Sequence, residues 1–98
     1  MELKKDEHLI FTLEQFEMIE KLVLQNKGAT RILLFFIKQK AKHSVIKLSY
    51  SEIAEELFMS YESVRVGVKF LQNNGYLEKQ DFRCKKETKK PTFNLLKF

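Results

Sequence analysis

The chain has 98 residues, 44% of them hydrophobic, and a net charge of +5, so we expect one domain over residues 1–98 with a modest core. Its longest apolar run, residues 32–37, is far too short for a membrane span, and no apolar signal segment follows the N-terminus. The single cysteine, Cys84, excludes an intramolecular disulfide, and together these features predict a cytoplasmic protein without a membrane partner.

The positive charge is concentrated in the later part of the chain. Residues 1–30 have six acidic and four basic side chains, whereas residues 31–98 have fourteen basic and seven acidic ones. A basic segment of this kind is typical of a protein that binds a polyanion. A lysine-rich surface that only faces water would have the same composition, so charge alone leaves both interpretations open.

Residues 1–11 show no clear periodicity and predict a poorly ordered arm, whereas residues 12–28 predict the first helix. Thr12 and Gln15 have the spacing of a capping box, and Lys27-Gly28 is a typical helix stop. We expect this helix to contribute an apolar stripe to the core or to a dimer contact. The stripe consists of Phe16, Ile19, Leu22 and Val23.

A second helix is predicted from residue 30 to about residue 40, with a middle that is apolar on every side. Such a helix is usually buried from several directions, which is hard to achieve within one small domain. We therefore expect a subunit interface that includes Phe35 and Phe36, with burial inside one chain as the alternative. The Ile and Phe content would also suit a strand, but the continuation Lys38-Gln39-Lys40-Ala41 favours a helix.

Residues 45–50 alternate loosely and predict a short strand, which leads into two short helices between residues 49 and 77. Ser49 and Glu52 have capping-box spacing, and Ser60 is placed to cap the second helix. Small residues in both helices would let them cross closely, and Asn74-Gly75 ends the pair, so the stretch predicts a helix-turn-helix. The inner faces are Ile53, Ala54 and Leu57, followed by Val64, Gly67, Val68 and Leu71.

The chain ends in a predicted hairpin, with strands over residues 76–82 and 92–98 and a turn over residues 85–91. Phe93 and Leu95 can share the core face of the second strand at a period of two. The predicted fold class is therefore α+β, mainly α with a small β-hairpin.

The order helix, helix, strand, helix, turn, helix, hairpin over residues 30–98 resembles the winged helix-turn-helix family of DNA-binding proteins. The segments that carry the resemblance are Ser49-x-x-Glu52, Ile53-Ala54-x-x-Leu57, Ser60-x-x-Ser63-Val64, Leu71 and Gly75-Tyr76-Leu77. The resemblance implies a winged-helix domain with an extra N-terminal helix at 12–28, a helix, short strand and helix-turn-helix over 30–77, and a wing hairpin over 76–98.

Two subgroups of the family are similar in size and in the extra helix. One consists of small repressors, and the other of TubR-like centromere-binding adaptors, which couple plasmid or phage DNA to a tubulin-like filament. The resemblance thus implies a homodimer that binds double-stranded DNA, acting as a transcriptional regulator or as a centromere-binding adaptor in plasmid or phage partition. In the second case a filament-forming GTPase would be a further partner.

One departure from the family concerns the turn between the two short helices. The family usually has a glycine there, whereas this chain has Leu57-Phe58-Met59-Ser60. Phenylalanine in the left-handed conformation costs roughly 1 kcal/mol or more. We therefore expect a turn that avoids positive φ angles and a somewhat different helix crossing.

A recognition helix enters the major groove by its first turns, where side chains reach base edges. Arg65 suits guanine readout because its fork matches O6 and N7, although it can instead clamp a phosphate or an acidic neighbour. The negative charge of Glu62 opposes phosphate binding, unless its carboxylate accepts a hydrogen bond from a cytosine amino group or orients Arg65. The candidate residues on this helix are Ser60, Tyr61, Glu62, Ser63, Arg65 and Lys69. The tip of the wing adds candidates for phosphate contact, namely Arg83, Lys85, Lys86, Lys89 and Lys90.

Val66 and Phe70 lie one turn apart on a side of the same helix that its inner apolar face does not cover. Phe70 packs under the wing or against the first helix, or else both residues belong to a dimer interface. In such a dimer two recognition helices would approach DNA together.

Catalytic and metal sites have little support in the sequence, so we expect neither an enzyme nor a cofactor. The two histidines, His8 and His43, lie in an arm and in a lysine-rich loop, and no cysteine–histidine set has zinc spacing. Glycine-rich phosphate loops and nucleophile elbows are missing as well. The alternative to DNA binding is a winged helix used as a protein–protein interaction module; RNA binding has less support because no sheet motif exposes stacking aromatics.

Overall fold

The computed structural model describes residues 11–43, 45–80 and 91–98. The expected N-terminal arm, apart from its last residue, and the tip of the expected hairpin with Cys84 lie outside the described residues. The described elements are α1 (Leu13–Gln25), α2 (Lys27–Lys42), β1 (Ile46–Lys47), α3 (Tyr50–Leu57), α4 (Tyr61–Asn73), β2 (Leu77–Gln80) and β3 (Thr92–Leu95). This part of the protein is mainly helical with a small antiparallel sheet, which confirms the predicted α+β class.

The boundary between the first two helices lies earlier in the chain than predicted. The capping box at Thr12 is confirmed, because Thr12 Oγ1 accepts from the Gln15 N–H and Gln15 Oε1 accepts from the Thr12 N–H. The expected stop at Lys27-Gly28 is wrong, since these residues form the first turn of α2. Asn26 ends α1 in an extended conformation, and its side chain accepts from the Ala29 N–H at 3.0 Å, which begins α2 at once.

The apolar stripe of α1 is only partly buried. Leu22 is fully buried and Ile19 packs against the core, as predicted. Phe16 and Val23 are instead 54% and 39% exposed, so they do not belong to the core, and the alternative of a dimer contact stays a prediction for them. The reason is that α1 packs mainly against one neighbour, α2, which covers only part of the stripe.

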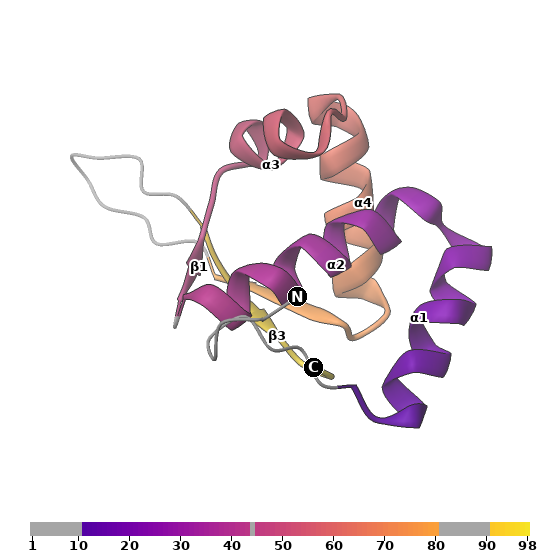
Figure 1. Ribbon diagram of the computed structural model, residues 1–98. Coiled ribbons are helices and arrows are strands. Elements are labelled where there is room, and N and C mark those ends of the chain that lie inside the picture. Colours follow the sequence, from indigo (N-terminus) through magenta and orange to yellow (C-terminus); the bar gives the residue numbers. More distant parts are fainter. Residues whose placement is uncertain (1–10, 44, 81–90) are drawn as a thin grey trace, which may run out of the picture.

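Helix α2 is the centre of the fold (Figure 1): α1, α3, α4 and β1 all pack against it. This arrangement buries its apolar middle within one chain, which is the alternative that the sequence left open. Phe36, for example, has no exposed surface and stacks on Phe93 of β3 with ring centroids 4.8 Å apart. The residues of α2 buried in this way are Ala29, Thr30, Ile32, Leu33, Phe36 and Ile37.

Helices α3 and α4 are joined by a short turn and pack against each other, as predicted. Ser49 and Glu52 form the expected capping box, and the Ser60 side chain accepts from the Ser63 N–H. The expected inner residues of α4, Val64, Gly67, Val68 and Leu71, are all buried. Gly67 does permit a close helix approach, but to α2 rather than to α3, because a Cβ there would lie 2.5 Å from Ile32 Cδ1.

The turn between α3 and α4 contradicts the expectation of a turn without positive φ. Phe58 has φ 54° and ψ 46°, the left-handed conformation, and its side chain is 94% exposed. This conformation lets the Met59 N–H reach back to the Ala54 carbonyl at 2.9 Å, which satisfies a carbonyl at the end of α3. The turn therefore forms this hydrogen bond although its left-handed residue is a phenylalanine and not a glycine.

The sheet has the strand order β1-β3-β2, with both pairs antiparallel. Residue 46 pairs with residue 93, and residue 77 pairs with residue 95. The second strand of the predicted hairpin, β3, therefore also pairs with β1, the short strand before α3. Phe93 is buried and Leu95 is half-buried on the core side, as predicted. The first strand is shorter than the predicted 45–50 because Tyr50 already belongs to α3.

Candidate nucleic-acid interface

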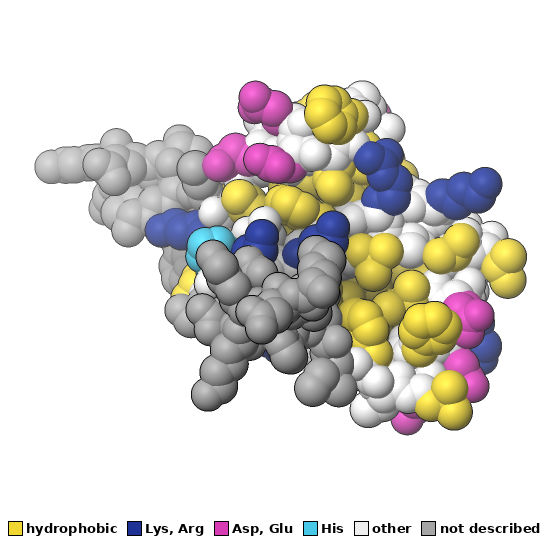
Figure 2. All heavy atoms as spheres, viewed as in Figure 1, with side chains coloured by type: hydrophobic (Ala, Val, Ile, Leu, Met, Phe, Trp, Pro, Cys, Tyr) yellow, Lys and Arg dark blue, Asp and Glu magenta, His cyan; other side chains and the backbone are white. Residues whose placement is uncertain are grey.

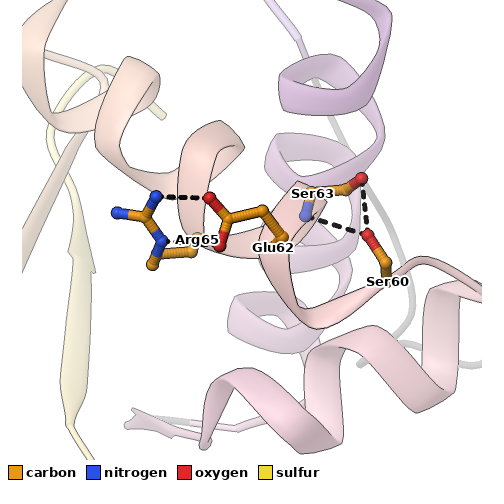
Figure 3. A network of polar contacts seen from close by, with 4 residues as sticks. All are labelled: Ser60, Glu62, Ser63 and Arg65. Atoms are coloured by element: carbon orange, nitrogen blue, oxygen red, sulfur yellow. Dashed lines mark hydrogen bonds and ion pairs between the residues drawn. The ribbon is translucent and has the colours of Figure 1, made fainter.

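The first turns of α4 present two polar pairs to solvent (Figure 3). The Ser60 hydroxyl donates to Ser63 Oγ at 2.8 Å while Ser60 Oγ accepts from the Ser63 N–H at 3.0 Å. Glu62 and Arg65 form the second pair, on the other side of the helix in this view. All four residues are exposed, so the start of α4 is an accessible polar surface of the kind that the sequence predicted.

Arg65 is held by an acidic neighbour, one of the roles that the sequence left open. Its Nε donates to Glu62 Oε2 at 3.0 Å and its Nη2 donates to Glu62 Oε1. The hydrogen bond from Arg65 lowers the pKa of the Glu62 carboxyl, and the same hydrogen bond raises the pKa of Arg65. Because the two side chains are 48% and 67% exposed, water screens the pair and its contribution to stability is small. Glu62 therefore orients Arg65 without holding it strongly.

A basic groove lies between α4 and β2. Arg65 and Lys69 from α4 and Lys79 from β2 line this open groove of about 460 Å³. Tyr50, the first residue of α3, lines it as well, and the Lys79 ammonium lies 4.7 Å from the centre of its ring. Tyr61 meets Tyr50 edge-on with centroids 5.9 Å apart, which continues the surface to the start of α4. Three cations and the Tyr50 ring thus line one open groove, and Tyr61 lies beside it against Tyr50.

Four residues of this basic groove were not predicted from the sequence: Tyr50, Gln72, Asn73 and Lys79. Gln72 lies three residues after Lys69 and seven after Arg65, so helical periodicity was a usable signal for it. For Tyr50 and Lys79 there was no such signal, because only the fold brings the start of α3 and β2 beside α4.

The residues expected at a dimer interface do not lie on one surface. Phe36 has no exposed surface, which leaves nothing of it for a partner to contact, and Phe35 is half-buried beside it. Phe70 is half-buried against the core, whereas Val66 is 48% exposed. Only Val66 among the four offers a substantial apolar surface to a partner.

The wing candidates Arg83, Lys85, Lys86, Lys89 and Lys90 lie outside the described residues, so their contact with DNA stays a prediction. The strands on either side of that segment, β2 and β3, are antiparallel neighbours, as a wing requires. Across residues 11–43, 45–80 and 91–98, histidine, cysteine and acidic side chains form no cluster suited to a metal ion. No helix in those ranges has the length and apolar character to cross a bilayer.

Comparisons of the chain with protein-family models, with curated proteins and with solved structures find no match.

Proposed function

We propose that this protein binds double-stranded DNA as a winged helix-turn-helix protein, with α4 in the major groove and the β2–β3 hairpin as the wing. The observation that carries the proposal is the basic groove, where Arg65, Lys69 and Lys79 converge between α4 and β2. A phosphate backbone that passes between a recognition helix and a wing would meet all three cations together. Cations that neutralise phosphates supply most of the sequence-independent affinity for DNA.

The helix-turn-helix geometry supports the same proposal. In this motif the first helix crosses the DNA backbone while the N-terminal residues of the second contact base edges. Here α3 and α4 pack against each other, and the first turn of α4 is exposed, with Tyr61 54% accessible. The positive end of the α4 dipole also favours an approaching phosphate.

The Glu62–Arg65 pair gives this surface a switch between free and bound forms. In the free protein the carboxylate occupies the guanidinium fork, and a phosphate or a guanine edge offers the same fork equivalent acceptors. A phosphate at Arg65 thus exchanges one ion pair for another, and a guanine edge exchanges it for two hydrogen bonds; losing the original pair costs little because water screens it. Glu62 then becomes free to accept a hydrogen bond from a cytosine amino group.

The biological role that we propose is transcriptional regulation or centromere binding in plasmid or phage partition. Both roles need a compact protein that recognises duplex DNA, and both follow from the family resemblance of residues 30–98. Protection of the DNA upstream of the protein's own gene would support regulation. Co-sedimentation of the DNA-bound protein with a tubulin-like filament would support partition.

Fluorescence anisotropy with a labelled mixed-sequence duplex tests DNA binding directly. We expect the logarithm of the affinity to fall with the logarithm of the salt concentration, with a slope of about −0.9 for each phosphate neutralised. An affinity that does not change between low and physiological salt, or no binding at either, would contradict the proposal. A protein that ignores DNA would favour the interaction-module alternative instead.

Single-lysine variants locate the binding surface. Lys69→Ala and Lys79→Ala should each weaken binding and reduce the magnitude of the salt slope by roughly one. Lys21→Ala is the matched control, since it removes the same charge from the exposed outer side of α1, away from the basic groove. Equal losses from all three variants would show that net charge, and not the groove, determines affinity.

A further inference from the structure

Phe58 combines two unfavourable features at one position. Its side chain is 94% exposed, the highest exposure among the large hydrophobic residues of the described chain. Its backbone is left-handed, the single non-glycine residue with positive φ in that part of the chain. A bulky residue in this conformation costs roughly 1–2 kcal/mol relative to glycine. Glycine or asparagine would suit the backbone better, so the ring itself calls for an explanation.

A groove that fits an aromatic ring lies next to Phe58. The next residue, Met59, forms one wall of this apolar groove of about 300 Å³ between the beginning of α2 and the outer side of α4. Val66, which is 48% exposed, lines it too, and the remaining lining residues are Asn26, Gly28, Glu62, Ser63 and Gly67, so the apolar walls have a polar edge. The Phe58 ring points into solvent and not into this neighbouring groove of its own chain, because it is almost fully exposed.

Charges of opposite sign flank Phe58 and the Met59 groove. Glu55 and Glu56 are exposed in the last turn of α3, just before Phe58. Lys27 and Arg31 are exposed at the beginning of α2, on the side of the groove that Gly28 forms. Figure 2 shows acidic side chains over α3 and basic side chains over the start of α2 on one face of the molecule.

We propose that this face binds a second copy of the chain, with the Phe58 ring of each copy in the Met59 groove of the other. A two-fold axis that passes between the ring and the groove places the ring of each copy against the groove of the other, as an isologous interface requires. The same rotation places the acidic end of α3 opposite the basic start of α2, so the face is self-complementary in charge as well as in shape. An exposed aromatic that fills a partner's pocket is the usual form of an interface hot spot.

This dimer leaves the cations of the basic groove free, because Arg65, Lys69 and Lys79 do not line the Met59 groove. Glu62 and Ser63 do line it, so the partner's ring would cover these two residues at the start of α4. The dimer does not depend on the proposed DNA binding, because it can be measured without DNA. If both are correct, two copies of α4 present their basic sides to one duplex.

Sedimentation equilibrium of the full chain without DNA tests the interface. We expect a reversible dimer, and Phe58→Asn should raise its dissociation constant about 30-fold, as expected for loss of a hot spot. Asparagine tolerates the left-handed backbone, so this variant keeps or improves the monomer's stability in urea. Leu24→Asn is the control, because Leu24 is 87% exposed on α1, and it should leave the dissociation constant unchanged.

Charge reversal provides an independent test with variants that do not weaken the fold. Lys27→Glu adds an acidic residue at a helix start, and Glu56→Lys adds a basic residue at a helix end, both of which suit the helix dipole. Each single reversal should raise the dissociation constant about threefold, and the double variant should restore it.

Three results would overturn the interface. The first is a wild-type chain that stays monomeric at high concentration, and the second is a Phe58→Asn protein that dimerises as the wild type does. The third is a double charge reversal that is no better than the single ones. If Phe58→Asn weakens DNA binding while the dimer is unchanged, the ring contacts DNA and the dimer surface is wrong. Loss of DNA binding by Lys79→Ala with an intact dimer would concern only the proposed function.

Discussion

Two helix ends in this protein share a residue with positive φ and the same backbone hydrogen bond, but the residue differs. Helix α3 ends at Phe58 with φ 54°, and α4 is followed by Gly75 with φ 76°. In both turns the next N–H reaches the carbonyl five residues back at 2.9 Å, from Met59 to Ala54 and from Tyr76 to Leu71. The left-handed residue is thus what closes each helix, whatever its side chain.

The comparison separates what the backbone needs from what the side chain adds. Glycine at 75 meets the conformational need at no steric cost, whereas phenylalanine at 58 meets it at a cost of roughly 1–2 kcal/mol. A distant cation also bonds to the helix end in both cases. Arg31 Nη2 donates to the Leu57 carbonyl, and Lys97 Nζ donates to the Asn74 carbonyl at 3.4 Å.

The largest effect is expected from removing the glycine. Gly75→Val should lower the free energy of unfolding by about 2 kcal/mol, because a β-branched residue resists the left-handed conformation. Space does not limit this substitution, since a Cβ at residue 75 would lie 3.8 Å from its nearest neighbour, Lys97 Cε. Urea denaturation followed by circular dichroism measures the change. Gly75→Asn is the control and should cost much less; equal losses would show that side-chain bulk, not φ, is the cause.

The reverse substitution at the other turn should stabilise the protein. Phe58→Gly should raise the free energy of unfolding by about 1 kcal/mol, because it relieves the left-handed strain and removes an almost fully exposed ring. The measurement needs a protein concentration low enough to keep any dimer dissociated. A loss of stability in the monomer would mean that the ring packs within its own chain.

Arg31 should matter less than either backbone residue. Arg31→Met keeps most of the apolar stem but removes the donor to the Leu57 carbonyl, and we expect a loss of about 0.7 kcal/mol. The loss should shrink as salt is added, because the interaction of a cation with a helix end is screened. A loss that does not depend on salt would indicate packing by the stem and not the charge.

Lys97 should have the smallest effect. Its bond to the Asn74 carbonyl is long, and its ammonium also lies over the Tyr76 ring, 4.6 Å from the centroid. Lys97→Met should cost about 0.3 kcal/mol in urea denaturation. If Lys97→Met costs as much unfolding free energy as Arg31→Met, the cation stabilises the glycine turn as much as the phenylalanine turn, and the two turns do not differ in this respect.

Local patterns of sequence predicted much of this fold. The caps at Thr12, Ser49 and Ser60 are confirmed, because a cap depends on a side chain and a backbone N–H only three residues apart. Buried faces followed from helical periodicity in α4, where four predicted residues are buried. Periodicity was a weaker guide in α1, since it marks an apolar stripe but not how much of it a neighbour covers.

The candidate site was predictable only where it lies on one element. Arg65 and Lys69 follow from the exposed side of α4, and both line the basic groove. Tyr50 and Lys79 come from α3 and β2, which are far from them in sequence. No spacing rule connects such residues, because the contact is made by the packing of the strand and the helices and not by a repeat.

The sequence by itself determined that four helices form, how three of them are capped and which face of α4 is buried, because those features depend on interactions within a few residues. Only the tertiary structure decided that Phe36 is buried within one chain, since that required β3 to place Phe93 against it. Only the structure showed that Phe58 is left-handed, because the hydrogen bond from the Met59 N–H to the Ala54 carbonyl, which closes α3, outweighs the preference of phenylalanine for negative φ.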